Sequence, residues 1–343
     1  MHQILNTLYV LTQRAYLHLD HDTVKVKVEG ETRLQVPLHH LGAVCCVGDV
    51  AASTALLHRC ADDGRSVVFL DYGGRFKGRL EGPVSGNVLL RRAQHEALSD
   101  PAKALLIARS IVAGKVQNAR QVLLRGAREA AAPEDEPPLQ EAARHLAESL
   151  PRLEAAPDLD TVRGVEGDAA RAYFAVFSRL VKEDRDTFRF EGRSRRPPRD
   201  PMNGLLSFLY TLLLSDCVAA AEGVGMDPQV GYLHALRPGR PALGLDLMEE
   251  LRAVLADRLA LTLVNRRQLS AKDFEERDGG AWSLTEAGRR TVVTAYQQRK
   301  QEEVFHTLAD QRVPLGLVPH VQARLLARHL RGELEYYPPF LYR

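Results

Sequence analysis

Two patterns of apolar and polar positions divide the chain. Up to about residue 80, apolar residues alternate with polar ones or gather in valine-rich runs, with short turns such as HDT and EGE between them. The stretches are TLYVLTQRAYLHLD, TVKVKVEGE and TRLQVPLHHLGAVCCVG. This pattern predicts β-strands. A helix from about Ala51 to Asp62, a strand over SVVFLDY and a turn over GGRFKGRL that leads into a further strand complete this part.

From about Asn87 onward, apolar residues recur three and four positions apart, which is typical of helices with one buried face. The helices expected are NVLLRRAQHEAL, PAKALLIARSIVAGKVQNARQVLLRGAREA, DTVRGVEGDAARAYFAVFSRLVKE, PMNGLLSFLYTLLLSDCVAAAEGVG, LDLMEELRAVLADRLALTLV and SLTEAGRRTVVTAYQQRKQEEV. The stretch AAPEDEPPLQEAA, residues 131–143, is predicted to be a polar connector. We therefore expect an α+β protein, with a small β-sandwich-like domain over residues 1–85 and a larger all-helical domain over residues 86–343.

Composition agrees with a folded soluble protein. The 343 residues are 45% hydrophobic and 26% charged. No apolar run is expected to be long enough to span a bilayer, and MHQILNTLYV lacks the basic leader and cleavage site of a signal peptide. The four cysteines fit neither a zinc site nor a disulfide framework. A reducing cytoplasm is the simplest location.

A carboxylate lies on the apolar face of the helix expected around RGVEGDAARAYFAVFSRLV. Glu166 falls in the middle of that face, whereas Asp168, Arg171 and Lys182 fall on the opposite side. The apolar residues of the face are Ala170, Tyr173, Phe177, Leu180 and Val181. Burying an unpaired carboxylate costs on the order of several kcal/mol. Glu166 is therefore a helix-capping acid, the partner of a buried arginine, or a functional acid.

A histidine and several acids occur together in GYLHALRPGRPALGLDLMEELR, residues 231–252. Asp246 and Glu249 are three residues apart and share a helix face that points away from the apolar stripe, so alone they indicate a solvated helix start. His234 alone is equally weak evidence for a site. Together with Glu166, however, an imidazole and a second acid could bind Mn²⁺ or Mg²⁺ and leave coordination positions open for catalysis.

Net charge is only +2, but arginines gather in FRFEGRSRRPPR, residues 188–199. Pro197 and Pro198 within this stretch, and Pro201 just after it, keep the chain from forming a helix here. It is either a solvated loop or a clamp for DNA phosphates, and the second interpretation is favoured because guanidinium groups match phosphate geometry. The candidate DNA-binding residues are Arg189, Arg193, Arg195, Arg196 and Arg199, together with Arg237 and Arg240 beside His234.

Three other stretches resemble sites but are interpreted as structural. HLDHD, residues 18–22, lies between two predicted strands and has the composition of a turn. The neighbouring pairs His39-His40 and Cys45-Cys46 point to opposite faces of a strand, so neither pair can chelate one ion. YGGRFKGR lacks the arrangement of a nucleotide-binding P-loop.

The order of several motifs gives the chain a family resemblance over essentially its whole length. It resembles the CRISPR-associated integrase of spacer acquisition, the first-numbered CRISPR-associated protein family, and is most similar to the type I-C form. The matching stretches are KVQNARQVL at 115–123, RGVEGDAARAYF at 163–174, RRPPRDPMNGLLSFLYTLL at 195–213, GYLHALRPGRPALGLDLMEELR at 231–252 and NRRQLSAKDF at 265–274.

The resemblance implies a metal-dependent DNA endonuclease and integrase. Its Mn²⁺ or Mg²⁺ ligands fall on Glu166, His234 and Glu249, with Asp246 as a supporting residue. Many members of the family carry Asp at the position of Glu249. The neighbouring Glu250 is therefore an alternative ligand, although the helical wheel favours Glu249. The motif residues Lys115 and Asn118 have no assigned role.

The family also works as a homodimer, and two dimers flank a dimer of a small second CRISPR-associated protein. The expected nucleic acids are the protospacer and the CRISPR repeat, and no membrane is involved. The N-terminal domain is expected to mediate dimerisation. Two alternatives from the residues themselves are a non-catalytic nucleic-acid-binding scaffold and a plain metal-dependent nuclease outside CRISPR biology.

Overall fold

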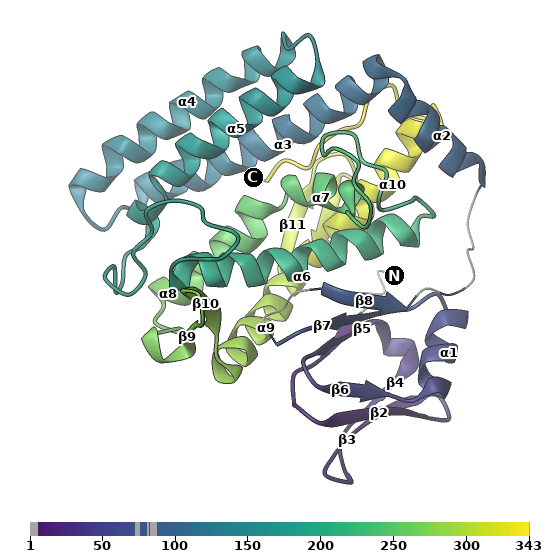
Figure 1. The fold of residues 1–343 in the computed structure, drawn as a ribbon. Coiled ribbons are helices and arrows are strands. Elements are labelled where there is room, and N and C mark those ends of the chain that lie inside the picture. Colours follow the sequence, from purple (N-terminus) through teal and green to yellow (C-terminus); the bar gives the residue numbers. More distant parts are fainter. Residues whose placement is uncertain (1–5, 73–75, 81, 83–87, 343) are drawn as a thin grey trace. The chain divides into compact units, whose positions relative to one another are not determined.

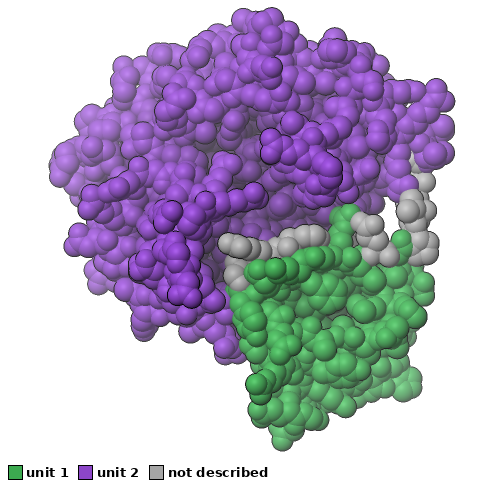
Figure 2. All heavy atoms as spheres, in the orientation of Figure 1, with its two compact units in different colours: residues 1–85 green, residues 86–343 purple. Residues whose placement is uncertain are grey.

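The computed structural model describes residues 6–72, 76–80, 82 and 88–342. The chain divides into two compact units, Met1–Ser85 and Gly86–Arg343, coloured green and purple in Figure 2. The division falls where the alternating sequence pattern gives way to the helical one. Each unit buries its own set of apolar side chains.

The first unit is built from two sheets and one helix. Its described strands are β1 (Asn6–Val10), β2 (Ala15–Asp20), β3 (Thr23–Val28), β4 (Glu31–Pro37), β5 (Leu41–Val47), β6 (Val50–Ala52), β7 (Ser66–Leu70) and β8 (Phe76–Leu80). Helix α1 spans Thr54–Asp62. One sheet has the order β1-β5-β7-β8 and the other β4-β3-β2-β6. The β-rich start expected from the sequence is confirmed, although two of the predicted stretches each contain two strands separated by a short irregular segment.

Alternating side chains explain the core of this unit. In β2, Ala15 and Leu17 are buried, and Val24 and Val26 of β3 lie on the same side of the sheet, so the hairpin presents an apolar face. His21 adopts a left-handed φ of 53° in the β2–β3 turn, so the turn predicted for HLDHD is confirmed for residues 21–22, whereas residues 18–20 belong to β2. The predicted GGRFKGRL turn lies partly outside the described residues.

The second unit is mostly helical. Its α-helices are α2 (Val88–Ser99), α3 (Pro101–Arg128), α4 (Glu136–Glu154), α5 (Leu159–Ala175), α6 (Pro201–Gly223), α7 (Ala242–Glu249), α8 (Arg258–Asn265), α9 (Glu286–Gln301) and α10 (Val318–Leu330). Two short hairpins pair β9 (Phe274–Arg277) with β10 (Ala281–Leu284), and β11 (Glu303–His306) with β12 (Gln311–Pro314). The α+β class is confirmed, and the larger unit is mostly rather than wholly helical. Figure 1 shows α3, α4 and α5 running alongside one another.

The predicted connector at 131–143 is wrong from Glu136 onward, where α4 begins. The prolines of PEDEPP indicated a break, but a proline in the first turn of a helix loses no hydrogen bond. Helix α4 then buries an apolar face of Leu139, Ala142, Ala143, Leu146 and Leu153. This helix covers the side of α5 that the sequence had assigned to solvent, where Asp168 now pairs with Arg152 and His145.

Helix α6 corrects the expectation that no apolar run could span a bilayer. Its 23 residues pass that test of length and composition, and 61% of its apolar window is buried inside the protein. It packs against α7, α10 and β10. A buried core helix meets the same criteria as a membrane span, so this is weak evidence for one.

The long helix predicted over residues 245–264 is interrupted. Helix α7 ends at Glu249, a π-helical turn spans Arg252–Asp257, and α8 continues from Arg258. π-helical turns are rare and are frequently found at functional sites. Here the turn follows directly after the two acids Glu249 and Glu250.

Candidate metal centre

Glu166 lies in the second turn of α5. It does not cap the helix, because Asp158 does so by accepting a hydrogen bond of 2.8 Å from the backbone nitrogen of Thr161. The Glu166 side chain is 26% exposed and Oε1 accepts a hydrogen bond from the ammonium group of Lys115 on α3. Its partner is therefore a lysine rather than the buried arginine that was one of the alternatives.

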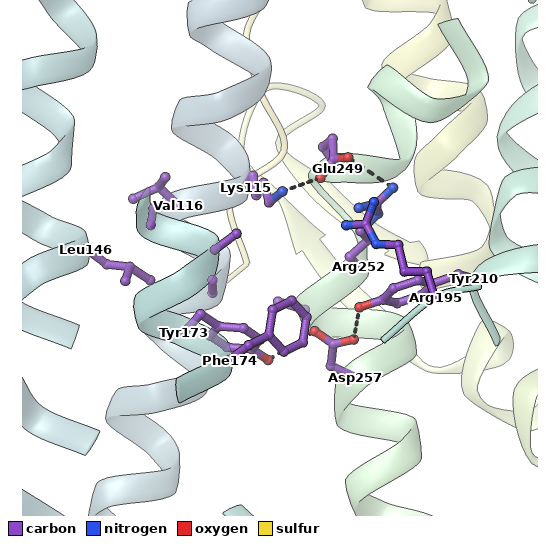
Figure 3. A pocket seen from close by; sticks show the side chains of 14 residues that line it. Lys115, Val116, Leu146, Tyr173, Phe174, Arg195, Tyr210, Glu249, Arg252 and Asp257 are labelled. Carbon is purple, nitrogen blue, oxygen red and sulfur yellow. Dashed lines mark hydrogen bonds and ion pairs between the residues drawn. The ribbon is translucent and has the colours of Figure 1, made fainter. Parts of the chain in front are cut away.

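Glu249 ends α7 and is 2% exposed. Lys115 Nζ lies 2.7 Å from Oε2, and Arg252 Nη2 lies 3.0 Å from Oε1 (Figure 3). The expectation of a solvated helix start is wrong, because α7 packs against α3, α6 and α10 and both of its faces are covered. One lysine thus joins the carboxylates of Glu166 and Glu249, which are 83 residues apart in the sequence (249 − 166).

The surroundings of Glu249 favour its ionised form. Burial acts to raise the pKa of this carboxyl, but the charges of Arg252, Lys115 and His234 outweigh burial and lower the pKa to about 2. Glu249 therefore keeps its negative charge throughout the physiological range. An ionised carboxylate at this depth requires cations beside it.

His234 is held in position by Asp246. Its Nδ1 lies 2.7 Å from Asp246 Oδ1, and the backbone nitrogens of residues 232, 233 and 234 donate to the same carboxylate at 2.6, 3.0 and 3.1 Å. The approach is close: a Cβ on Gly231 would lie 2.7 Å from Asp246 Oδ2. Because an ionised carboxylate only accepts hydrogen bonds, Nδ1 carries a proton, and in the neutral form of the ring Nε2 then keeps its lone pair. Nε2 lies 3.6 Å from Glu249 Oε1.

Glu250 points away from these residues. Its oxygens accept hydrogen bonds from the Tyr337 hydroxyl at 2.7 Å, Gln322 Nε2 at 2.8 Å and the Phe340 backbone nitrogen at 2.7 Å. Burial raises the pKa of Glu250 to about 8, against the lowering effect of these hydrogen bonds. Of the two neighbouring acids, Glu249 faces His234 and Glu166, while Glu250 ties α7 to the C-terminal segment.

The donor set of Glu166, His234 and Glu249 fits a hard divalent cation. Two atoms that each lie about 2.1 Å from one ion are about 3.0 Å apart at a right angle and up to about 4.2 Å apart across it, so the 3.6 Å between His234 Nε2 and Glu249 Oε1 suits two ligands of one ion. Glu249 Oε2 is buried and has the Lys115 ammonium as its sole polar partner among the described residues. As the side chains stand, no three His, Cys, Asp or Glu residues of the described ranges form a closed metal cluster. Lys115 lies between the two glutamates instead.

A small pocket opens beside this centre (Figure 3). Lys115, Glu249, Arg252 and Arg195 line one part of it, and aliphatic and aromatic side chains together with Asp257 line the rest. At about 30 Å³ it has room for an ion or one to two waters but not for a nucleotide. The pocket thus offers solvent access to the Lys115–Glu249 ion pair.

A buried carboxyl closes the floor of the pocket. Asp257 accepts hydrogen bonds from the Tyr210 hydroxyl at 2.7 Å and the Tyr173 hydroxyl at 3.1 Å. Burial raises the pKa of Asp257 to about 6, although both hydrogen bonds act to lower it. The guanidinium of Arg252 lies 5.1 Å from the Tyr210 ring. This network fixes the side chain that pairs with Glu249.

The candidate DNA-binding arginines differ in their surroundings. Arg193 is turned inward, where its guanidinium donates to Asn203 Oδ1 at 2.6 Å and to Ser207 Oγ at 3.0 Å. Arg189 pairs with Glu191 on the surface, and Arg199 makes a long bond of 3.4 Å to the Gly279 carbonyl. Arg195 and Arg196 are exposed and have no ion pair with any described residue. These two are the arginines of the run best able to meet a phosphate.

The loop beside His234 contributes to the same basic surface. Arg237 is exposed, and Arg240 is half-buried. Burial lowers the pKa of Arg240, and so do the charges of Arg237, Arg196 and Arg163. The structure therefore brings guanidinium groups from α5, from the arginine run and from this loop within electrostatic range of one another.

Two cationic side chains that pair with Glu249 had no role assigned from the sequence: Lys115 and Arg252. The helical pattern could have singled out Lys115. It lies four residues after Ile111 and four before Ala119, which places a charged residue on the buried face of α3. Arg252 lies three residues after Glu249, the spacing of a helical ion pair. The four cysteines all lie in the described part of the chain and are buried without disulfide bonds, as expected.

Comparison with known proteins gives a consistent match. The family described as "CRISPR associated protein Cas1" matches residues 8–298. A CRISPR-associated endonuclease Cas1 of Moorella thermoacetica is 62% identical over 343 residues and covers 100% of both chains.

Solved structures agree with this match. A Cas1 protein from Thermotoga maritima has a TM-score of 0.80 at 25% identity, covering 95% of this chain and 97% of that one. A chain of a Cas6-RT-Cas1–Cas2 complex has a TM-score of 0.84 at 25% identity, covering 98% of this chain and 36% of that chain.

Proposed function

The chain belongs to the CRISPR-associated Cas1 family, the endonuclease and integrase of spacer acquisition, and we propose that its reaction centre is a Mn²⁺ or Mg²⁺ site formed by Glu166, His234 and Glu249. The reaction that we propose for this centre is strand transfer, in which the 3′-hydroxyl of a short DNA attacks a phosphodiester of the repeat array. The bond from phosphorus to the leaving 3′-oxygen breaks as the new bond forms.

One observation supports the site more than any other. The Lys115 ammonium joins a carboxylate of α5, Glu166, to Oε2 of the carboxylate that ends α7, Glu249, and His234 Nε2 lies 3.6 Å from the other oxygen of Glu249. Two acids this close to one another are unfavourable without a cation, because like charges repel strongly in a partly buried site. Lys115 and Arg252 offset this repulsion in the protein as it stands, and a divalent ion bound by the same carboxylates would offset it too.

Each residue has a distinct role in the proposal. Asp246 fixes the proton of His234 on Nδ1, so that Nε2 points to the centre as a neutral donor. Arg252 holds the Glu249 carboxylate in place. When bound, the ion would act as a Lewis acid that orients the attacking oxygen and offsets charge on the phosphoryl group. The exposed Arg195, Arg196 and Arg237 bind phosphates of the DNA.

The experiment is strand transfer by the purified protein. Glu166→Gln, His234→Asn and Glu249→Gln are expected to lower integration of a 3′-hydroxyl DNA into a repeat-containing target by about 100-fold or more. The matched control is Glu250→Gln, which changes the neighbouring acid. EDTA should abolish the reaction of the wild-type protein. Normal integration by all three ligand variants would refute the site.

The assembly is a further part of the proposal. We expect a homodimer formed through the N-terminal β unit, with two dimers flanking a dimer of the small second protein, Cas2, and with protospacer and repeat DNA bound in the cytoplasm without a membrane. The solved Cas6-RT-Cas1–Cas2 complex, by its name, contains a similar chain together with Cas2. The type I-C subtype rests on the motif set of the sequence. Size measurement of the protein with and without its neighbouring small gene product, and the gene's position beside a repeat array, test these points.

A further inference from the structure

Lys115 lies where a divalent ion would have to bind. We propose that Lys115 is an internal counter-ion that the divalent ion displaces on binding, so that the ammonium group and the metal compete for Glu166 and Glu249. This inference rests on the proposed metal site and adds a residue that controls the affinity of that site.

The four charged side chains that pair with one another around Lys115 balance without a metal. Glu166 and Glu249 supply two negative charges, and Lys115 and Arg252 supply two positive ones. A divalent ion added to these four groups would leave two positive charges beside a carboxylate that is 2% exposed. Like charges at such short range are strongly unfavourable in a poorly solvated site, so binding of the ion requires a cation to leave.

Contacts identify Lys115 rather than Arg252 as the group that leaves. Arg252 is held from two sides, by Glu249 Oε1 at 3.0 Å and by the Tyr210 ring at 5.1 Å. Among the described residues, Lys115 forms ion pairs only with the two glutamates, and its side chain, 15% exposed, lines the pocket that opens to solvent. An unbranched lysine stem can also change rotamer without moving the backbone.

Distances make the two cations mutually exclusive. The ammonium nitrogen is 2.7 Å from Glu249 Oε2 and also donates to Glu166 Oε1. An ion about 2.1 Å from the same oxygens would be in van der Waals overlap with that nitrogen. This accounts for the lack of a closed three-donor cluster among the described side chains.

The displaced ammonium has a place to go. Within the pocket, Arg195 is exposed, and the carboxylates of the lining are Glu249 and the buried Asp257. A lysine that turns toward the mouth of the pocket adds positive charge beside Arg195, where a DNA phosphate would offset it. Metal binding and DNA binding therefore favour each other, while the protein without a metal keeps its two acids neutralised.

The test measures Mn²⁺ affinity, from the electron paramagnetic resonance signal of the free ion. Lys115→Met keeps the stem and removes the charge, and we expect it to lower the Kd for Mn²⁺ about tenfold relative to wild type. Lys115→Arg keeps the charge and should bind Mn²⁺ no tighter than wild type. Lys103→Met, the same change at an exposed position of the same helix, should leave the Kd unchanged.

These measurements distinguish a failure of the role proposed for Lys115 from a failure of the proposed metal site. An unchanged or weaker Mn²⁺ affinity in Lys115→Met, with wild type binding the ion, would overturn the role of Lys115 and leave the metal site intact. Failure of wild type and all variants to bind Mn²⁺ would overturn both.

A second measurement uses the unmodified protein, so it does not depend on the folding of Lys115→Met. Acetylation of Lys115 by an amine-selective reagent, read by mass spectrometry, should rise severalfold when Mn²⁺ replaces EDTA, while acetylation of Lys103 stays constant. Equal protection of Lys115 in both conditions, at a Mn²⁺ concentration shown to saturate the protein, would contradict displacement.

Discussion

Nδ1 of His234 lies 2.7 Å from Oδ1 of Asp246, and this carboxylate also accepts the backbone N–H groups of residues 232–234. A single acid at 0% exposure thus fixes both the loop that carries His234 and the tautomer of its ring. Carboxylate–histidine pairs of this kind orient metal ligands in many proteins. Asp246 therefore acts on the proposed ion through His234.

Asp246→Asn tests this indirect role. An amide NH₂ in place of Oδ1 would donate to Nδ1, move the ring proton to Nε2 and remove the lone pair that faces Glu249. We expect Mn²⁺ affinity and strand transfer to fall about 10- to 100-fold. The position of the proton can be read from the ¹⁵N chemical shifts of the labelled ring, a measurement that a loss of packing alone would not change. A wild-type tautomer together with wild-type affinity would contradict the prediction.

Glu249 and Glu250 are neighbours with opposite effects on acid stability. The folded pKa of Glu249 is about 2, below its ordinary value of 4.5, so its contribution to the free energy of unfolding is present above pH 4.5 and is lost as the pH falls toward 2. The folded pKa of Glu250 is about 8, above 4.5. Between pH 4.5 and 8 the folded chain keeps this proton and the unfolded chain has lost it, so stability falls as the pH rises.

Glu250→Gln should remove the second effect. A glutamine imitates the protonated acid, so the decline in stability of about 1.4 kcal/mol per pH unit at its steepest should flatten between pH 5 and 8. Urea unfolding at several pH values measures this. The variant should keep metal binding, because Glu250 contacts Tyr337, Gln322 and Phe340 rather than the centre. An unchanged pH profile would show that Glu250 is ionised in the folded protein.

Local periodicity described the surroundings of these acids poorly. It placed Glu166 on a buried face of α5 and Asp168 in solvent, yet their side chains are 26% and 28% exposed, and it assigned Asp246 and Glu249 to solvent although both are buried. The error has a physical cause: α7 is only eight residues long and is covered by helices that are distant in the sequence, which no local pattern reports. The grouping of Glu166, His234 and Glu249 came from family resemblance. Lys115 was in a quoted motif, yet its role depends on two partners 51 and 134 residues away in the sequence (166 − 115 and 249 − 115).

Substitutions in the arginine run, residues 188–199, should fall into two classes: those that weaken DNA binding and those that lower stability. Arg195→Ala and Arg196→Ala remove exposed charges, so each should lower the slope of log affinity against log salt by about 1 and leave stability unchanged. Arg193→Ala removes buried bonds to Asn203 and Ser207 and should lower the free energy of unfolding by about 2 kcal/mol. Filter binding of duplex DNA across a salt series, together with thermal unfolding, separates the two. An unchanged salt slope in the Arg195→Ala, Arg196→Ala double variant would exclude this clamp.

Asn118 anchors the C-terminal segment to the helix that carries Lys115. Its amide donates to the carbonyl oxygens of Glu250 at 2.7 Å and Phe340 at 2.9 Å, and its own oxygen accepts from the backbone nitrogen of Tyr342 at 2.8 Å. The C-terminal segment, yellow in Figure 1, accordingly ends beside α3. Replacing this side chain would leave buried backbone groups without partners.

Asn118→Ala should therefore lower the free energy of unfolding by about 3 kcal/mol and release the segment. Limited proteolysis should cut near residues 333–342 in the variant well before it cuts the wild-type protein. Gln121→Ala, at an exposed position on the same helix, is the matched control and should change neither property. Resistance to proteolysis equal to that of wild type would show that the other contacts of Tyr337 and Phe340 hold the segment without Asn118.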